Sequence, residues 1–275
     1  RAAAFPGVMA IPGRLLFGIF RPKDRRLGSE FAGVVEALGA GASRFAVGER
    51  VYGFSPNRGA SADYLALPET AAIAPLPDGL SVEQGAALPF GGLAALVFLR
   101  RFGRLKAGQA VLINGASGGV GVYATQIAKA YGARVTGVAG PEKQGLLREL
   151  GADETIDYRA VDIAKLAARF DLILDAVGGL TPAAGLGLLK ADGVFLPLNY
   201  GLPEIGAALL NAFRRRKIKL AVNDDTAEDL ATLSALVEQG DLKPVIDGVY
   251  PLEDAAAAHA RVESRRKTGA VVLRH

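Results

Sequence analysis

The sequence predicts an α/β fold: a doubly wound parallel sheet of six strands, joined to a β-rich part. Two observations carry this prediction. From Ser81 onward short apolar strands alternate with helical segments, and a glycine-rich turn joins the first of these strands to a helix. Before Ser81 the chain has short alternating segments punctuated by glycines. The predicted parallel strands are 110–114, 134–138, 154–158, 170–175, 194–196 and 218–222.

The glycine-rich turn is the most specific segment. Its sequence GASGGVG follows an apolar strand and precedes a helical pattern that ends at Gly132. Alanine replaces the first glycine of the G-x-G-x-x-G pattern, but strand, turn, helix and second strand are all present, so a purely structural turn is the poorer explanation. Glycines let phosphates approach the backbone, and the helix dipole stabilises their charge. The predicted contacts of a dinucleotide pyrophosphate are Gly115, Ala116, Ser117, Gly118, Gly119, Val120 and Gly121.

Helix starts and stops organise the rest of the chain. Ser81 and Gln84 form a capping box that opens a helix interrupted by Pro89, and Thr226 and Asp229 form a second box. The other predicted helices are 143–150, 181–189 and 254–264, and the other predicted strands are 33–38, 50–54, 62–67 and 270–273.

Composition excludes several classes of protein. Half of the 275 residues are hydrophobic, yet no apolar run approaches a membrane span, so we expect a soluble protein and take the cytoplasm as its location. The absence of cysteine excludes disulfides and thiolate metal sites. A net charge of +4 does not imply nucleic-acid binding, and the basic clusters 214–217 and 265–267 read as solvated faces. Residue 1 is Arg rather than Met, so we expect the natural start to be missing.

Five further segments are characteristic: LGSEFAGVV at 27–35, FAVGERVYG at 45–53, AALPFGG at 86–92, LGADETIDY at 150–158 and DAVGG at 175–179. With the glycine-rich turn, they make nearly the whole chain resemble the medium-chain dehydrogenase/reductases, within them the zinc-independent quinone-oxidoreductase-like branch. The resemblance implies a Rossmann dinucleotide-binding domain at 81–223. This domain would be inserted in a GroES-like catalytic domain of residues 1–80 and 224–275, incomplete at its start, with the active-site cleft between the two.

The histidines argue against the zinc chemistry of other members of this superfamily. Those members hold zinc with Cys and His, whereas this chain has no Cys and two histidines, His259 and His275. His259 lies in an alanine-rich helix and His275 is terminal. Glu30 matches an acidic position near the metal of zinc members and is read as a structural carboxylate. We therefore expect no metal site.

The end of the second strand predicts the choice of cofactor. NAD-preferring folds place Asp or Glu there, which binds the ribose 2′-OH, whereas this chain has Ala139. Lys143, Tyr158 and Arg265 match positions that resemble the 2′-phosphate contacts of NADPH-dependent quinone reductases. NADPH is therefore favoured over NADH, with the negative charge of Glu142 as the opposing observation.

Nicotinamide contacts are expected at the carboxyl ends of the central strands, at Val177, Asn199 and Tyr200. For Tyr200, ordinary loop packing is the alternative. Relatives often have threonine where this chain has Ala94, which removes a side-chain hydrogen bond near the cofactor. Tyr52 is considered as a proton donor, but packing is the better interpretation, and no catalytic acid is assigned.

The resemblance implies an NADPH:quinone oxidoreductase-like enzyme that transfers hydride to a quinone or another conjugated carbonyl or alkene acceptor. The alternative is an NAD(P)H-binding redox-sensing or interaction protein without turnover. A nucleic-acid role for the cluster at Arg214 is a second rival, which no recognition motif supports. Relatives pair their sheets across subunits, so we expect a homodimer through the edge strand 218–222.

Overall fold

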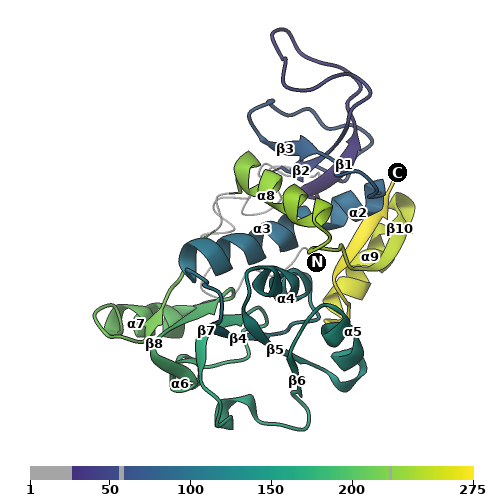
Figure 1. The fold of residues 1–275 in the computed structure, drawn as a ribbon. Helices are drawn as coiled ribbons and strands as arrows, with labels where there is room; N and C mark the ends of the chain where they lie inside the picture. Colours follow the sequence, from purple (N-terminus) through teal and green to yellow (C-terminus); the bar gives the residue numbers. More distant parts are fainter. Residues whose placement is uncertain (1–26, 56–58, 223–224) are drawn as a thin grey trace. The chain divides into compact units, whose positions relative to one another are not determined.

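The structure is a computed structural model and describes residues 27–55, 59–222 and 225–275 (Figure 1). Its chain divides into two units. Among the described residues, the sheet unit comprises 98–117 and 124–222, and the flanking unit comprises 27–97, 118–123 and 225–275. The boundaries 81 and 223 between the two expected domains stay a prediction, and the expected incomplete start falls outside the described residues.

The sheet unit confirms the predicted fold class. Six parallel strands lie in the order β6-β5-β4-β7-β8-β9, so the chain starts in the middle of the sheet, builds one edge and then returns to build the other (Figure 1). The strands are β4 (Ala110–Asn114), β5 (Arg134–Ala139), β6 (Glu154–Asp157), β7 (Phe170–Asp175), β8 (Leu189–Pro197) and β9 (Lys217–Ile218).

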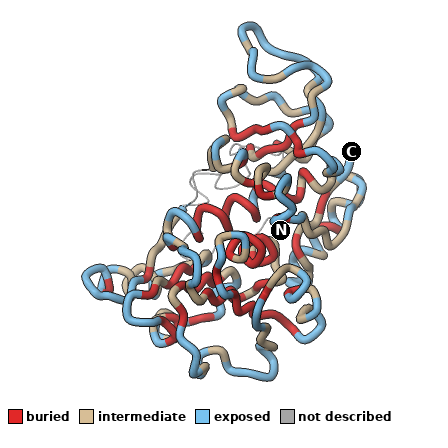
Figure 2. The backbone as a smooth tube through the Cα atoms, in the orientation of Figure 1, coloured by how far each residue is buried: buried red, intermediate tan, exposed pale blue. Residues whose placement is uncertain are grey.

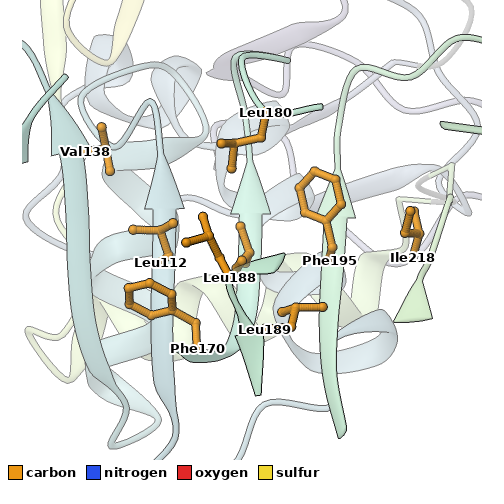
Figure 3. Packing of buried hydrophobic residues seen from close by; sticks show 9 residues of the cluster. Leu112, Val138, Phe170, Leu180, Leu188, Leu189, Phe195 and Ile218 are labelled. Atoms are coloured by element: carbon orange, nitrogen blue, oxygen red, sulfur yellow. The ribbon is translucent and has the colours of Figure 1, made fainter. Parts of the chain in front are cut away.

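The central strands β4, β5 and β7 are nearly continuous apolar runs and are buried along almost their whole length, as is typical of parallel strands covered on both faces. Figure 2 shows the central strands as buried backbone. Figure 3 shows side chains of one core cluster, which comes from five strands and the segments beside them. The cluster consists of Leu112, Val138, Phe170, Ile173, Leu180, Leu188, Leu189, Phe195 and Ile218.

Helical segments connect these strands. The helix after the glycine-rich turn ends where sequence predicts, because Gly132 takes a left-handed φ of +74°. Thr181 caps the next-to-last helix of this unit by accepting the Ala184 N–H. The α-helices and one preceding π-helix are η2 (Phe98–Phe102), α4 (Gly121–Ala130), α5 (Gln144–Glu149), α6 (Pro182–Gly187) and α7 (Leu202–Leu210), and the 3-10 turns are η3 (Pro141–Lys143) and η4 (Ile163–Lys165).

The flanking unit holds two small sheets and four α-helices in its described part. One sheet is antiparallel in the order β1-β2-β3, and the other is the parallel pair β10-β11. The predicted capping box at Ser81 is confirmed, since Ser81 and Gln84 bond reciprocally. Of the second box, the N-cap bond is confirmed: Thr226 accepts the Asp229 N–H, and its hydroxyl donates to the Asp229 carboxylate. The elements are β1 (Glu30–Val34), β2 (Arg50–Phe54), β3 (Ala72–Pro75), α2 (Val82–Ala87), α3 (Pro89–Val97), α8 (Ala227–Glu238), β10 (Ile246–Pro251), η5 (Leu252–Asp254), α9 (Ala255–Glu263) and β11 (Ala270–Arg274).

Several predicted strands of the flanking unit are wrong or displaced. The strand expected at 33–38 is β1, which begins earlier, at Glu30, and ends at Val34, opposite Arg50 of β2. The segment 62–67 forms no strand, since β3 occupies the second edge of β2. β10 was not predicted at all. Each of these differences concerns which segment finds a pairing partner, which alternation alone does not specify.

Two boundaries also differ in the sheet unit. The expected strand 194–196 begins earlier, at Leu189, so the predicted helix 181–189 ends at Gly187. Of the expected edge strand 218–222, only Ile218 belongs to β9, with Lys217 beside it. β9 is short because its pairing with β8 covers two positions, Val194 with Lys217 and Phe195 with Ile218.

No helix among the described residues is both long enough and apolar enough to cross a membrane.

Candidate cofactor site

The glycine-rich turn begins with a left-handed residue. Gly115 has a φ of +80°, and the N–H groups of Gly115 and Ala116 donate to the Val138 carbonyl at 3.1 and 2.9 Å. The turn therefore needs its glycine at 115, one residue before the position that the G-x-G-x-x-G pattern assigns. Ala116 is fully buried, and its methyl group packs against Gly137 of β5. This packing explains why alanine is accepted in the pattern.

Val177 and Asn199 come close to this turn at the carboxyl edge of the sheet. The Val177 Cγ2 methyl lies where a side chain on Gly115 would be, so these residues are in direct contact. Asn199 donates from Nδ2 to the Ala176 carbonyl at 3.3 Å. Three strands thus bring together Gly115 after β4, Val177 after β7 and Asn199 after β8. Tyr200 follows Asn199 and is half-buried.

Asp175 organises this edge, and the sequence analysis gave it no role. Its carboxylate is fully buried and accepts the Asn114 side-chain amide at 2.9 Å. It also accepts the backbone N–H groups of the loop that carries Val177, with donors at 177, 178, 179 and 180 between 2.9 and 3.4 Å. One carboxylate therefore fixes the loop after β7 to the strand before the glycine-rich turn. The signal in the sequence was an acidic residue at the buried end of an apolar strand.

The end of β5 shows how the proposed specificity residues lie. Ala139 is buried, and the Gln144 amide bonds to the carbonyls of Ala139 and Ile156 at 3.0 and 3.2 Å, which ties β5 to β6. Lys143 ends the 3-10 turn η3 and is half-buried, while Tyr158, just after β6, is exposed. The structure therefore places both at neighbouring strand ends.

Glu142 has a cationic partner that the sequence analysis missed. The Arg159 guanidinium lies 3.5 Å from its carboxylate and 5.6 Å from the ring centre of Tyr158. The carboxylate itself lies beside the Cα of Gly140. Arg159 therefore offsets the negative charge that opposed phosphate binding, to the modest extent that an exposed pair allows.

Arg265 belongs to the flanking unit. It follows α9, is exposed, and adopts a left-handed φ of +57°. Its expected approach to Lys143 and Tyr158 joins the two units and stays a prediction.

The second half of the turn packs within the flanking unit. A side chain on Gly91 of α3 would overlap the Gly119 carbonyl oxygen and come within 2.8 Å of the Tyr123 ring. Tyr123 is fully buried and donates its hydroxyl to the Ala87 carbonyl at 2.8 Å. The AALPFGG segment therefore supplies the surface on which residues 118–123 rest.

Glu30 and Lys267 lie near the same segment. Glu30 of β1 accepts the N–H of Phe90 at 2.8 Å, and burial raises the pKa of its carboxyl to about 7. Lys267, before β11, has its pKa lowered by burial and interacts with the charge of Glu30. A side chain on Gly119 would meet the Lys267 Nζ at 3.0 Å. Glu30 thus has a structural partner, as expected, and Lys267 is a cation that sequence analysis did not single out.

Tyr52 is held by structural hydrogen bonds. Its hydroxyl bonds to the Leu230 carbonyl and to the Ser234 hydroxyl, each at 2.9 Å, and burial raises its pKa to about 12. These bonds connect β2 to α8 and favour the packing interpretation.

The described residues contain no group of three or more acidic, His or Cys side chains able to hold a metal ion. His275 lies 3.4 Å from Asp63, and Glu30 has the partners given above. The donor set that zinc prefers, Cys and His, is reduced to two histidines in the whole sequence.

The basic cluster at 214–217 is largely engaged with its own unit. Arg215 forms a bidentate pair with Asp192 at 2.8 Å, and Arg216 donates to the Lys190 carbonyl at 3.3 Å. These bonds favour the interpretation as a solvated face.

Comparison with known proteins places the chain in a family. The alcohol dehydrogenase GroES-like domain matches residues 9–78, and the zinc-binding dehydrogenase model matches residues 150–273. A quinone oxidoreductase of Pseudomonas aeruginosa is 34% identical over 264 residues, which are 90% of this chain and 81% of that protein.

Two solved structures are similar as well. The quinone oxidoreductase from Coxiella burnetii has a TM-score of 0.85 at 27% identity, covering 96% of this chain and 83% of its own. The Escherichia coli quinone oxidoreductase complexed with NADPH has a TM-score of 0.80 at 28% identity, covering 96% and 87%. The chain therefore belongs to the medium-chain dehydrogenase/reductase superfamily of oxidoreductases, in its quinone-oxidoreductase-like branch.

Proposed function

We propose that this chain is a zinc-independent, NADPH-dependent reductase that transfers hydride to a quinone or another conjugated carbonyl or alkene acceptor. One observation carries the proposal: the left-handed Gly115 lies against Val177, so the turn predicted to bind the phosphates and the loop predicted to face the nicotinamide meet at one edge of the sheet. The similar Escherichia coli enzyme, which was solved with NADPH, supports the choice of cofactor. The cytoplasm is the proposed location.

The residues present fit such a cofactor. The turn Gly115–Gly121 would hold the pyrophosphate, because its four glycines leave the backbone open to close approach and the N–H groups at the start of α4 favour negative charge. Val177, Asn199 and Tyr200 would orient the nicotinamide, and Lys143, Tyr158 and Arg265 would hold the 2′-phosphate. When bound, NADPH supplies the hydride. The protein then positions donor and acceptor and excludes water.

A conjugated acceptor suits the side chains available. A simple carbonyl that accepts hydride develops alkoxide charge, which requires a Lewis acid or a proton donor, whereas a quinone spreads the charge over its ring. The sequence has no Cys and two His for a zinc site, and the Tyr52 hydroxyl is already bonded to Leu230 and Ser234. We assign no catalytic acid.

The first prediction tests cofactor binding and turnover. Titration of the protein with NADPH, followed by nucleotide fluorescence, is expected to give a dissociation constant about tenfold below that for NADH, since a charge-assisted contact contributes about 1.5–3 kcal/mol. Lys143→Glu should remove most of this preference, whereas Lys106→Glu, a change at an exposed lysine before β4, should leave it unchanged. NADPH oxidation is then screened with quinones, enones and aldehydes.

Each outcome of that screen has a distinct meaning. Oxidation with quinones or enones supports the proposal, and oxidation with saturated aldehydes alone contradicts the acceptor class. Binding without oxidation favours the redox-sensing alternative. If neither nucleotide binds, the proposed cofactor site is wrong.

We also propose a homodimer through the edge of the sheet that β9 forms. α7 and the segments around β9 expose apolar side chains that a partner would cover: Leu209, Leu210, Phe213 and Val222 are between 73% and 103% exposed. An open edge strand beside an exposed apolar surface favours pairing with a second copy about a twofold axis.

The second prediction tests this dimer. Sedimentation velocity at micromolar concentration is expected to show a dimer, and Leu210→Glu should convert it to a monomer, because a charge would be buried without a partner. Val47→Glu, at an exposed position of the flanking unit, is the matched control and should stay dimeric. A monomeric wild-type protein would contradict the proposal.

A further inference from the structure

Lys267 lies beside the second half of the glycine-rich turn, which belongs to the flanking unit as Lys267 does. Its Nζ donates to the Gly269 carbonyl, and both atoms lie beside the Cα of Gly119, where a Cβ would be 3.0 Å from the amine and 3.4 Å from the carbonyl oxygen. The absence of a side chain at 119 therefore admits an ammonium group to the backbone of the turn. This placement involves residues of one unit only.

The loop that carries Lys267 is firmly held. The N–H of Thr268 donates to Asp247 at 2.7 Å, and Asp247 also forms a bidentate pair with Arg261 at 2.6 and 2.7 Å. The Asp247 carboxylate thus already has a guanidinium partner. The negative charge of Asp247 interacts with Lys267, but Asp247 forms its ion pair with Arg261.

Glu30 is the second acid that faces Lys267. Its carboxylate accepts the N–H of Phe90, next to the Gly91 that contacts Gly119, so it holds the backbone on which the same turn packs. Burial raises its pKa to about 7, while Lys267 lowers it and Asp225 raises it. The negative charge of Glu30 also contributes to raising the pKa of the Tyr123 hydroxyl in α4. Near neutral pH, Glu30 is therefore only partly ionised and compensates Lys267 incompletely.

We propose that Lys267 is a cofactor-binding residue whose ammonium contacts the pyrophosphate at the Gly118–Gly121 bend, and that the negative charge of Glu30, when ionised, partly offsets that of the ammonium. This inference rests on the proposed function. A diphosphate is the ligand that suits this position. Its negative charge needs a cation next to backbone N–H groups, and the partly desolvated ammonium of Lys267 provides that cation. Of the residues proposed to bind the 2′-phosphate, Lys143 and Tyr158 belong to the other unit, and Arg265 is two residues before Lys267.

The test separates the two phosphate groups of NADPH. Lys267→Gln keeps a donor toward the Gly269 carbonyl but removes the charge, and it is expected to raise the dissociation constant for NADPH about tenfold or more. Adenosine 2′-monophosphate has no pyrophosphate, so its affinity should not change. Lys267→Arg should restore most of the NADPH affinity, and Lys106→Gln is the matched control. Thermal unfolding of each variant reports whether the fold is kept.

Glu30→Gln provides an independent experiment, in which the pH-dependence of NADPH affinity is measured. A purely structural role of Glu30 would not change this pH-dependence. In the wild-type protein, ionisation of Glu30 between pH 6 and 8, the range on either side of its pKa of about 7, should weaken NADPH binding by adding a negative charge near the turn. The ratio of the wild-type to the Glu30→Gln dissociation constant should therefore increase with pH. The ionisation of NADPH itself cancels in this ratio.

The outcomes decide between the inference and the proposed function. If the wild-type protein binds NADPH and Lys267→Gln binds it equally well, the inference is wrong and the proposed function stands. An equal loss of adenosine 2′-monophosphate binding would also overturn it. If Lys267→Gln fails to fold, the pH-dependence of the ratio for Glu30→Gln decides: a flat ratio contradicts the inference. No NADPH binding by the wild-type protein contradicts the proposed function.

Discussion

Asp175→Ala is expected to lower the free energy of unfolding by about 3–5 kcal/mol, the range for a buried charged group removed from its partners. The carboxylate is fully buried and accepts the Asn114 amide and four backbone N–H groups. Alanine leaves these donors without an acceptor in a place that water reaches poorly, and each unsatisfied buried group costs about 1–3 kcal/mol. Partial rearrangement of the loop keeps the total below the simple sum.

Urea unfolding followed by circular dichroism measures this loss. Asp192→Ala is the matched control, because Asp192 is likewise a hydrogen-bonded carboxylate of the sheet unit, paired with Arg215, but lies at the surface. Its removal should change the free energy of unfolding by less than about 1 kcal/mol. If the free energy of unfolding of Asp175→Ala lies within about 1 kcal/mol of the wild-type value, the prediction that this carboxylate holds the loop in place is wrong.

Gly91→Ala is expected to destabilise the protein by about 3 kcal/mol, at the upper end of the range for overpacking. The added methyl would overlap the Gly119 carbonyl oxygen and lie 2.8 Å from two carbons of the Tyr123 ring. Neither neighbour is the flexible end of a side chain, since one is backbone and the other a buried ring bonded to Ala87. The strain falls on the glycine-rich turn, so NADPH affinity should decrease as well.

Gly145→Ala is the matched control for this substitution. Gly145 also lies near the start of a helix, α5, but a methyl group there would meet nothing within 4 Å. Because alanine favours a helix more than glycine does, this variant should gain about 0.5–1 kcal/mol. Opposite signs for the two glycines in thermal unfolding are the expected result, and equal effects would contradict it.

Local patterns were sufficient to predict much of the sheet unit. Continuous apolar runs identify its strands, and Gly132 marks the end of one of its helices. In the flanking unit, the capping residues Ser81 and Thr226 mark the starts of two helices, because each acts through backbone groups a few residues away. The prediction of strands in the flanking unit was poorer. The segment 62–67 alternates like a strand, yet β3 pairs with β2 instead, and β10 went unnoticed. Pairing is a choice among distant segments, which alternation does not encode.

The site divides in the same way. The sequence by itself determined that a strand, a glycine-rich turn and a helix would follow one another at 110–130, because these depend on neighbouring residues. Only the tertiary structure decided that Val177 lies on Gly115, that Asp175 ties two strand ends together, and that Lys267 reaches Gly119 from 148 residues further along the chain. The physical reason is that these contacts form when distant segments pack, and packing depends on the complementarity of whole surfaces.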